Sequence, residues 1–116
     1  MRHARRYRKL NLPTDQRLQV LTDLVVALFT HDKIKTTVTR AKEAQALADR
    51  FVTLAKRPTL AAKRRLAAYV KRRPLVKMIV DKAQAKFEGR TSGYTRVVRV
   101  GFRRGDGAPL AMLELV

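Results

Sequence analysis

The order of apolar and polar residues divides the chain into helical segments followed by strands. Between residues 14 and 89 apolar side chains recur at intervals of three and four, whereas from residue 94 they alternate with other side chains. The first spacing is typical of amphipathic helices and the second of strands with one buried face. The pattern therefore predicts an α+β fold in two layers, with about four helical segments packed on a small three-stranded sheet.

The first helix is predicted to follow the turn formers that end at Pro13. Thr14 can cap this helix by accepting a backbone N–H, and Asp15 faces the positive end of the helix dipole. The helix should end near residues 30–32. Its buried face is expected to carry Leu18, Leu21, Leu24, Val25 and Leu28.

Three more helices are predicted before residue 90. Thr39 is placed to cap a second helix that ends near Lys56, because the residue before Pro58 avoids the helical region. A short basic helix is expected over residues 60–72, and a fourth helix opens at Pro74 and is capped by Gly89. The inward residues would be Ala44, Leu47, Ala48, Phe51, Leu54 and Ala55 on the second helix, and Val76, Ile79, Val80, Ala83 and Phe87 on the fourth.

The last third of the chain is predicted to form two paired strands. Residues 94–102 alternate and residues 110–116 are largely apolar, while residues 103–107 contain two glycines suited to a tight turn. The two strands should therefore form an antiparallel hairpin. The β-branched segment 34–38 is expected to lie beside them as a third strand.

The charge of the chain points to a polyanionic partner. Its 116 residues include 27 Lys and Arg but only 9 Asp and Glu, which gives a net charge of +18. Such charges repel one another in a free protein, whereas each cation placed on a phosphate releases counterions. Because 46% of the residues are apolar, a folded core is also expected. We therefore predict a basic RNA-binding arm over residues 1–12 and a single α/β domain over residues 13–116.

The candidate nucleic-acid contacts fall into three basic clusters. The arm contains no acid, and its tyrosine could stack on an unpaired base. For the basic helix, the alternative is that its cations form a solvent-exposed face with no specific role. For Tyr94, the alternative is an ordinary position at the edge of a strand. Hairpin-tip arginines are better phosphate candidates than the two strand arginines, which alternate between faces. The candidates are Arg2, His3, Arg5, Arg6, Tyr7, Arg8 and Lys9 in the arm, Lys63 and Arg64 in the helix, and Tyr94, Arg96, Arg103 and Arg104 in the hairpin.

The sequence offers little for catalysis or for metal binding. There is no cysteine, which excludes disulfides and thiolate sites and suits the reducing cytoplasm. His3 and His31 lack metal-ligand spacing, the carboxylates are dispersed, and the glycines near Asp106 lack the lysine of a phosphate-binding loop. No apolar run approaches the ~20 residues that span a membrane. We predict no enzyme activity, cofactor, metal, membrane association or small-molecule substrate.

Seven short motifs resemble, in order and spacing, the family of the seventeenth protein of the bacterial large ribosomal subunit. The resemblance covers nearly the whole chain. The motifs are Met1-Arg2-His3, Arg8-Lys9-Leu10-Asn11, Ile34-Lys35-Thr36-Thr37, Ala41-Lys42-Glu43, Thr53-Leu54-Ala55-Lys56, Gly93-Tyr94-Thr95-Arg96 and Arg104-Gly105-Asp106-Gly107-Ala108-Pro109.

This resemblance implies a structural role in a ribosome. It implies helices on a small mixed three-stranded sheet, direct binding to large-subunit ribosomal RNA, and a place near the peptide exit tunnel among other ribosomal proteins. The ribosome would be cytoplasmic, with an organelle ribosome as the alternative. The family's RNA-facing positions correspond to Arg2, His3, Arg8, Lys9, Lys35, Thr36, Thr37 and Lys42, followed by Tyr94 and Arg96.

The chain departs from the family pattern at three places, one of which is Ser92, where a second glycine is usual. Tyr7 stands where a glycine is usual, and Pro13–Gln16 replace most of a Ser-Ser-His-Arg segment of which Arg17 remains. Two other functions compete with the ribosomal one. A free-standing nucleic-acid-coating protein would explain the charge without the ordered motifs, and a small nuclease would need His3 or His31 for cleavage.

Overall fold

The computed structural model describes residues 10, 12–57 and 59–116. The described chain forms four helices and three strands, as the sequence pattern predicts, so the α+β class is confirmed. In chain order the elements are α1 (Thr14–His31), β1 (Lys33–Thr37), α2 (Val38–Lys56), α3 (Leu60–Val70), α4 (Arg73–Phe87), β2 (Thr95–Phe102) and β3 (Pro109–Leu115).

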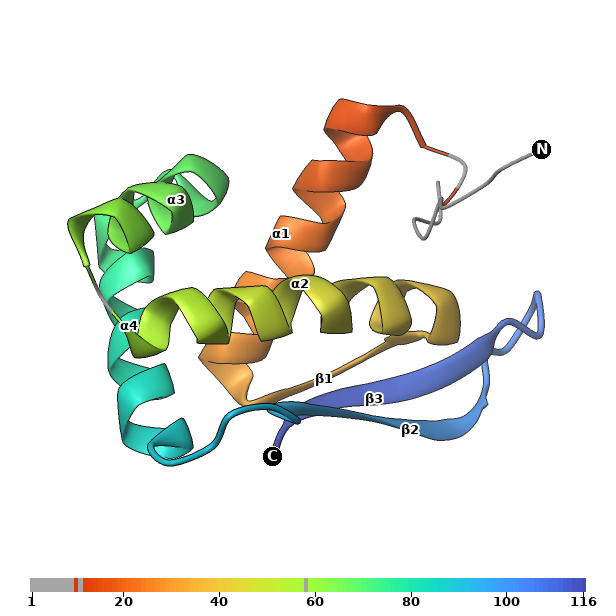
Figure 1. Ribbon diagram of the computed structural model, residues 1–116. Helices are drawn as coiled ribbons and strands as arrows, with labels where there is room; N and C mark the ends of the chain where they lie inside the picture. The colour runs from red at the N-terminus through yellow and green to blue at the C-terminus, as the bar shows by residue number, and fades with distance from the viewer. Residues whose placement is uncertain (1–9, 11, 58) are drawn as a thin grey trace, which may run out of the picture.

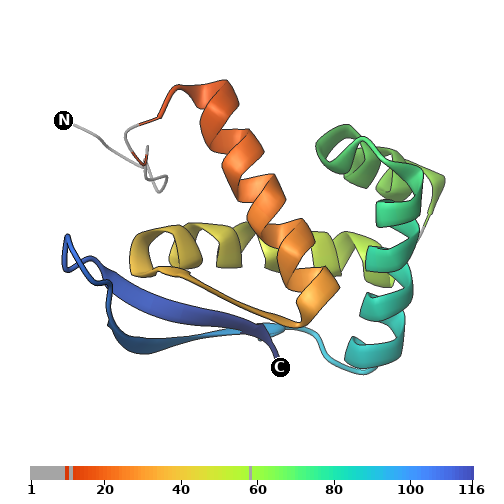
Figure 2. The ribbon, with the colours of Figure 1, turned by 180° about the vertical axis from the view of Figure 1, so that it is seen from behind.

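Helices cover one face of the sheet. α1 and α2 cross above the three strands, while α3 and α4 stand at the end of α2 farthest from the hairpin tip (Figure 1). The view from behind shows the same two layers, with the opposite face of the sheet bare in the described chain (Figure 2). The molecule is thus a two-layer fold with one end built from helices and the other from a hairpin.

The sheet is antiparallel throughout, which corrects the expectation of a mixed sheet. Its strand order is β1-β3-β2, and both pairings with the central β3 are antiparallel. β1 and β2 run in the same direction, and they would form a parallel pair only if they were neighbours. Because β3 lies between them, no parallel ladder forms.

The buried face of α1 is shifted from the predicted one. Leu21, Val25 and Leu28 are buried as expected, but Leu18 is 48% exposed and Phe29 is fully buried instead. The first turns of α1 extend away from α2, so no other described helix or strand covers a side chain near its N-terminus (Figure 1). Packing therefore begins one turn later than the apolar pattern indicates.

The core gathers around α2, which packs against every other helix and strand. Its inward face is rich in alanine, and these small side chains let neighbouring elements approach closely. Most inward residues predicted for α2 are confirmed, although Leu47 and Leu54 are only partly buried and Val52 was not predicted. All five inward residues predicted for α4 are buried.

Two of the predicted helix caps are wrong. Thr14 is the first helical residue after Pro13, and α2 begins at Val38, before Thr39. β1 continues to Thr37, which pairs with Leu110 of β3, so the chain passes directly from strand to helix. At the end of α4, Gly89 adopts the predicted left-handed backbone, with φ of 82°.

A hydrogen bond ties α2 to β2. The Thr95 hydroxyl donates to Oδ1 of Asp49 at 2.9 Å, and Gln45 donates to the Thr95 carbonyl oxygen at 3.3 Å. Burial raises the pKa of the Asp49 carboxyl, while the bond from Thr95 opposes that rise. The bond therefore supports a carboxylate that is partly withdrawn from water.

Thr95→Val should lower the free energy of unfolding by about 1–2 kcal/mol near neutral pH, because Asp49 loses its donor while water replaces part of the bond. The bond favours the ionised carboxylate, so its contribution is lost as Asp49 becomes protonated at low pH. Urea unfolding should therefore show a smaller difference near pH 3 than near pH 7. Thr53→Val is the matched control, since the Thr53 hydroxyl donates only to the Asp49 carbonyl oxygen of its own helix. Equal losses for both variants would contradict this account.

Candidate nucleic-acid interface

The arm candidates lie outside the described residues. Arg2, His3, Arg5, Arg6, Tyr7, Arg8 and Lys9 therefore stay predictions.

One cationic groove lies where β1, α2 and the β2–β3 hairpin meet. We call it the hairpin groove, and its volume is about 610 Å³. The fold brings the predicted residues of β1 together with the predicted hairpin-tip arginines, which are far apart in the sequence. The groove is lined by Lys35, Thr36, Thr37, Arg40, Phe102, Arg103, Arg104 and Leu110.

Most cations of the hairpin groove have no partner among the residues that the structure describes. Within the described part of the chain, Lys35, Arg40 and Arg104 form no hydrogen bond or ion pair. Arg103 differs, because its Nε donates to Oδ1 of Asp106 at 3.0 Å and its Nη2 contacts Oδ2. The bond from Arg103, helped by the Ala108 N–H, lowers the pKa of Asp106 to about 2. The carboxylate thus stays ionised and offsets one cation, while three others remain uncompensated.

The start of α2 adds to the positive potential of this groove. The helix begins at Val38 without an acidic residue in its first turn, in contrast to α1, which has Asp15 there. The positive end of the α2 dipole is therefore not offset by a local carboxylate of that turn. Arg40 belongs to the same turn and was not among the sequence candidates.

A second cationic groove lies between α3 and α4, and we call it the helical groove. Its volume is about 950 Å³. The predicted Lys63 and Arg64 lie here beside Arg73 and Lys77, which sequence reasoning missed; these two residues stand one turn apart on α4, which begins one residue before the predicted start at Pro74. An apolar floor separates these cations. The lining is Leu60, Lys63, Arg64, Ala67, Arg73, Pro74, Val76, Lys77, Val80 and Asp81.

The two grooves lie at opposite ends of α2. The hairpin groove includes the first turn of this helix, and α3 and α4 pack beside its C-terminal part (Figure 1). With 19 residues, α2 is about 28 Å long. This span exceeds the screening length of roughly 8 Å at physiological salt. Each groove can therefore bind its own anionic segment without competing with the other.

Two predicted contacts on β2 and just before it have protein partners. Tyr94 is 3% exposed, its ring lies 5.2 Å from that of Phe87, and its hydroxyl donates to the Arg90 carbonyl oxygen at 3.3 Å. A ring so enclosed cannot stack on RNA, so Tyr94 belongs to the core. Arg96 is exposed, but its Nε and Nη2 lie 2.7 and 2.6 Å from Oε1 of Glu114.

Arg17 and Lys42 lie outside both grooves. Arg17 is half-buried in the first turns of α1, and Lys42 is exposed on α2. The structure therefore brings together Lys35, Thr36, Thr37, Arg103 and Arg104, and separately Lys63 and Arg64.

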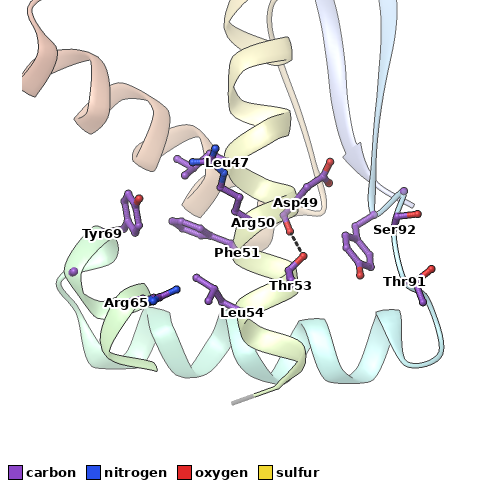
Figure 3. A pocket seen from close by; sticks show the side chains of 13 residues that line it. Leu47, Asp49, Arg50, Phe51, Thr53, Leu54, Arg65, Tyr69, Thr91 and Ser92 are labelled. Carbon is purple, nitrogen blue, oxygen red and sulfur yellow. Dashed lines mark hydrogen bonds between the residues drawn. The ribbon is translucent and has the colours of Figure 1, made fainter. Parts of the chain in front are cut away.

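A third concavity runs along α2 between α3 and the loop before β2, with a volume of about 780 Å³. Figure 3 shows the ring of Tyr69 beside that of Phe51. Arg50 and Arg65 also line this pocket. The Phe51 and Tyr69 ring centroids are 5.4 Å apart, so this wall is already packed. Asp49, the acidic residue of this pocket, accepts a hydrogen bond from the Thr95 hydroxyl. This pocket has fewer cations than either groove.

The described residues contain no cluster of three His, Cys, Asp or Glu side chains that could hold a metal ion. None of the helices in that part of the chain combines the length and the hydropathy that crossing a membrane requires.

Comparison with known proteins gives a consistent result. Residues 20–116 match the family described as "Ribosomal protein L17". The chain is 49% identical over 110 residues to "Large ribosomal subunit protein bL17" of Clostridium acetobutylicum, an alignment that covers 95% of this chain and 96% of the relative. It is 50% identical to the protein of that name from Clostridium perfringens, with 95% and 97% covered.

Arg104→Gln should weaken RNA binding more than Arg96→Gln, although both variants lose one positive charge. Arg104 is unpaired in the hairpin groove, whereas Arg96 is held by Glu114. In filter binding across a salt series, Arg104→Gln should reduce the slope of log affinity against log salt by about 1. Arg96→Gln should change it by less. Equal changes would mean that total charge, and not the groove, governs binding.

Proposed function

Because the chain belongs to the ribosomal protein L17 family, we propose that it is a non-enzymatic structural constituent of the large ribosomal subunit that binds large-subunit ribosomal RNA. The observation that carries the proposal is the pair of cationic grooves at the two ends of α2. Each groove contains several cations, and fewer acidic residues lie near them. A folded RNA supplies phosphates that can pair with these cations.

The proposed mode of binding is contact with the RNA backbone. The major groove of an A-form helix is too narrow for side chains to read, so arginine and lysine bind phosphates at helix junctions and across minor grooves. Arginine suits this task because its planar guanidinium can donate two parallel hydrogen bonds. The affinity should therefore depend on RNA shape more than on sequence.

The rigid separation of the grooves suggests how the protein would support assembly. Two RNA segments bound at the ends of α2 would be held at a fixed distance, because α2 is packed against every other element. We further propose that residues 1–12 extend this contact as a basic arm attached to the globular domain. The position near the peptide exit tunnel, neighbouring ribosomal proteins as partners and a cytoplasmic bacterial ribosome complete the proposal.

Removing cations at either end should weaken binding by separate and additive amounts. One double variant is Lys35→Gln with Arg104→Gln, and the other is Lys63→Gln with Arg64→Gln. Each should reduce the salt slope by about 2 if both cations contact phosphates, and the fourfold variant by about 4. Wild-type affinity for large-subunit RNA should fall about a thousandfold between 50 and 200 mM salt if six or more phosphates are engaged.

The same assay separates this proposal from its rival. Equal affinity for duplex DNA and large-subunit RNA at matched salt would favour a nucleic-acid-coating protein. In cells, the tagged chain should sediment with the large subunit through a high-salt gradient. Its absence from that fraction would contradict the ribosomal role.

A further inference from the structure

Phe102 is exposed beside the cations of the hairpin groove. It is 77% exposed, more than any other large apolar residue in the described chain. Lys35, Arg40, Arg103 and Arg104 line the same groove. An aromatic ring so exposed among cations is not part of the core, which gathers around α2.

A β-bulge determines the face on which Phe102 lies. The register of β2 against β3 shifts by one residue between Arg99 and Gly101, so that Phe102 pairs with Pro109. A shift of one residue exchanges the two faces of a strand. Strict alternation would place Phe102 with Val98 on the open face, but the shifted register pairs it with Pro109 on the helix side of the sheet. Gly101 accommodates the bend with φ of 136°.

The turn beyond Phe102 holds this arrangement in place. The Arg103 N–H donates to the Ala108 carbonyl oxygen at 2.8 Å, and the Gly107 N–H donates to the Arg103 carbonyl oxygen at 3.1 Å. The side chains of Arg103 and Asp106 form an ion pair across the same turn. The ring is thus presented by a hydrogen-bonded hairpin and does not depend on a ligand for its position.

We propose that the hairpin groove receives an unstacked nucleotide of RNA, with its base on the ring of Phe102 and the flanking phosphates on Lys35, Arg40 and Arg104. This inference rests on the proposed RNA-binding function and adds a nucleotide class to it. Aromatic side chains stack on any base, so the site selects an unpaired nucleotide and not a particular base.

The lining favours a nucleotide over a segment of another protein. An apolar peptide could cover Phe102, but it would leave three unpaired cations desolvated beside it. A nucleotide meets both needs, because its base is flat and apolar on its faces and its phosphates are anionic. The volume of about 610 Å³ falls within the usual range of small-ligand sites. A paired base cannot enter, because its faces are covered by its neighbours in the helix.

The test compares two RNA hairpins that differ by one bulged nucleotide, 2-aminopurine, whose fluorescence changes when it stacks. The full-length protein should bind the bulged RNA more tightly and alter its fluorescence. Phe102→Ala should weaken binding of the bulged RNA about tenfold, which corresponds to ~1.4 kcal/mol. It should change binding of the fully paired RNA less than about twofold. Phe102→Trp should retain both signals, and Phe102→Leu, which keeps apolar bulk without a ring, should lose them.

Val98→Ala is the matched control, because Val98 is a 43% exposed apolar residue on the open face of the same strand and lines neither groove. It should bind both RNAs like the wild type, and urea unfolding should show that Phe102→Ala folds normally. The inference is overturned if Phe102→Ala weakens both RNAs equally, if Phe102→Leu binds like the wild type, or if Phe102→Ala impairs only binding to another ribosomal protein. None of these three results would contradict the proposal that the grooves bind RNA phosphates. Failure of the wild type to bind either RNA at low salt would instead overturn the proposed function.

Discussion

Burial of α2 among all the other elements is the interaction on which this structure depends. Ala41, Ala44 and Ala48 are fully buried on its inward face, so helices and strands approach its backbone closely. Phe51 then fills the space near α3 and α4. Such a core is small, and its stability must exceed the repulsion among the cations outside it. The dense packing of α2 explains how a chain with a charge of +18 can fold compactly.

The few acidic residues form ion pairs that reduce the repulsion among cations at a few positions. At other positions the repulsion between cations is not reduced in this way. Asp32 accepts a hydrogen bond from Lys82 that lowers its pKa, and Glu114 holds Arg96 on the sheet. Asp106 forms an ion pair with Arg103 within the hairpin turn. These pairs lie mostly at element junctions, where they support the fold. Among the described residues, most cations of the two grooves have no such partner, so an external anion would relieve their repulsion.

The helices and strands were predictable because their signals are local. Apolar spacing identified all four helices, and the inward residues of α4 matched fully. The starts of α1 and α2 were predicted less well, because Thr14 and Thr39 have good capping chemistry but tertiary pairing sets the boundaries. β1 stays in the sheet as far as Thr37, and this strand pairing excludes a cap at Thr39. The mixed sheet was wrong for a related reason, since strand order is a property of the whole chain.

Most charged residues of the site could be predicted from the sequence, but the surface that they form together could not. Lys35 and Arg104 were identified separately, yet nothing local in the sequence joins them. Arg40 and Phe102 were missed because a helical arginine and a strand phenylalanine have ordinary explanations. The available signal was Gly101, since a glycine inside a strand often marks a bulge. A bulge there exchanges the faces of the residues that follow, so Phe102 lies on the helix side of the sheet and lines the hairpin groove with Arg40. The function of a basic hairpin can therefore depend on one glycine that carries no charge at all.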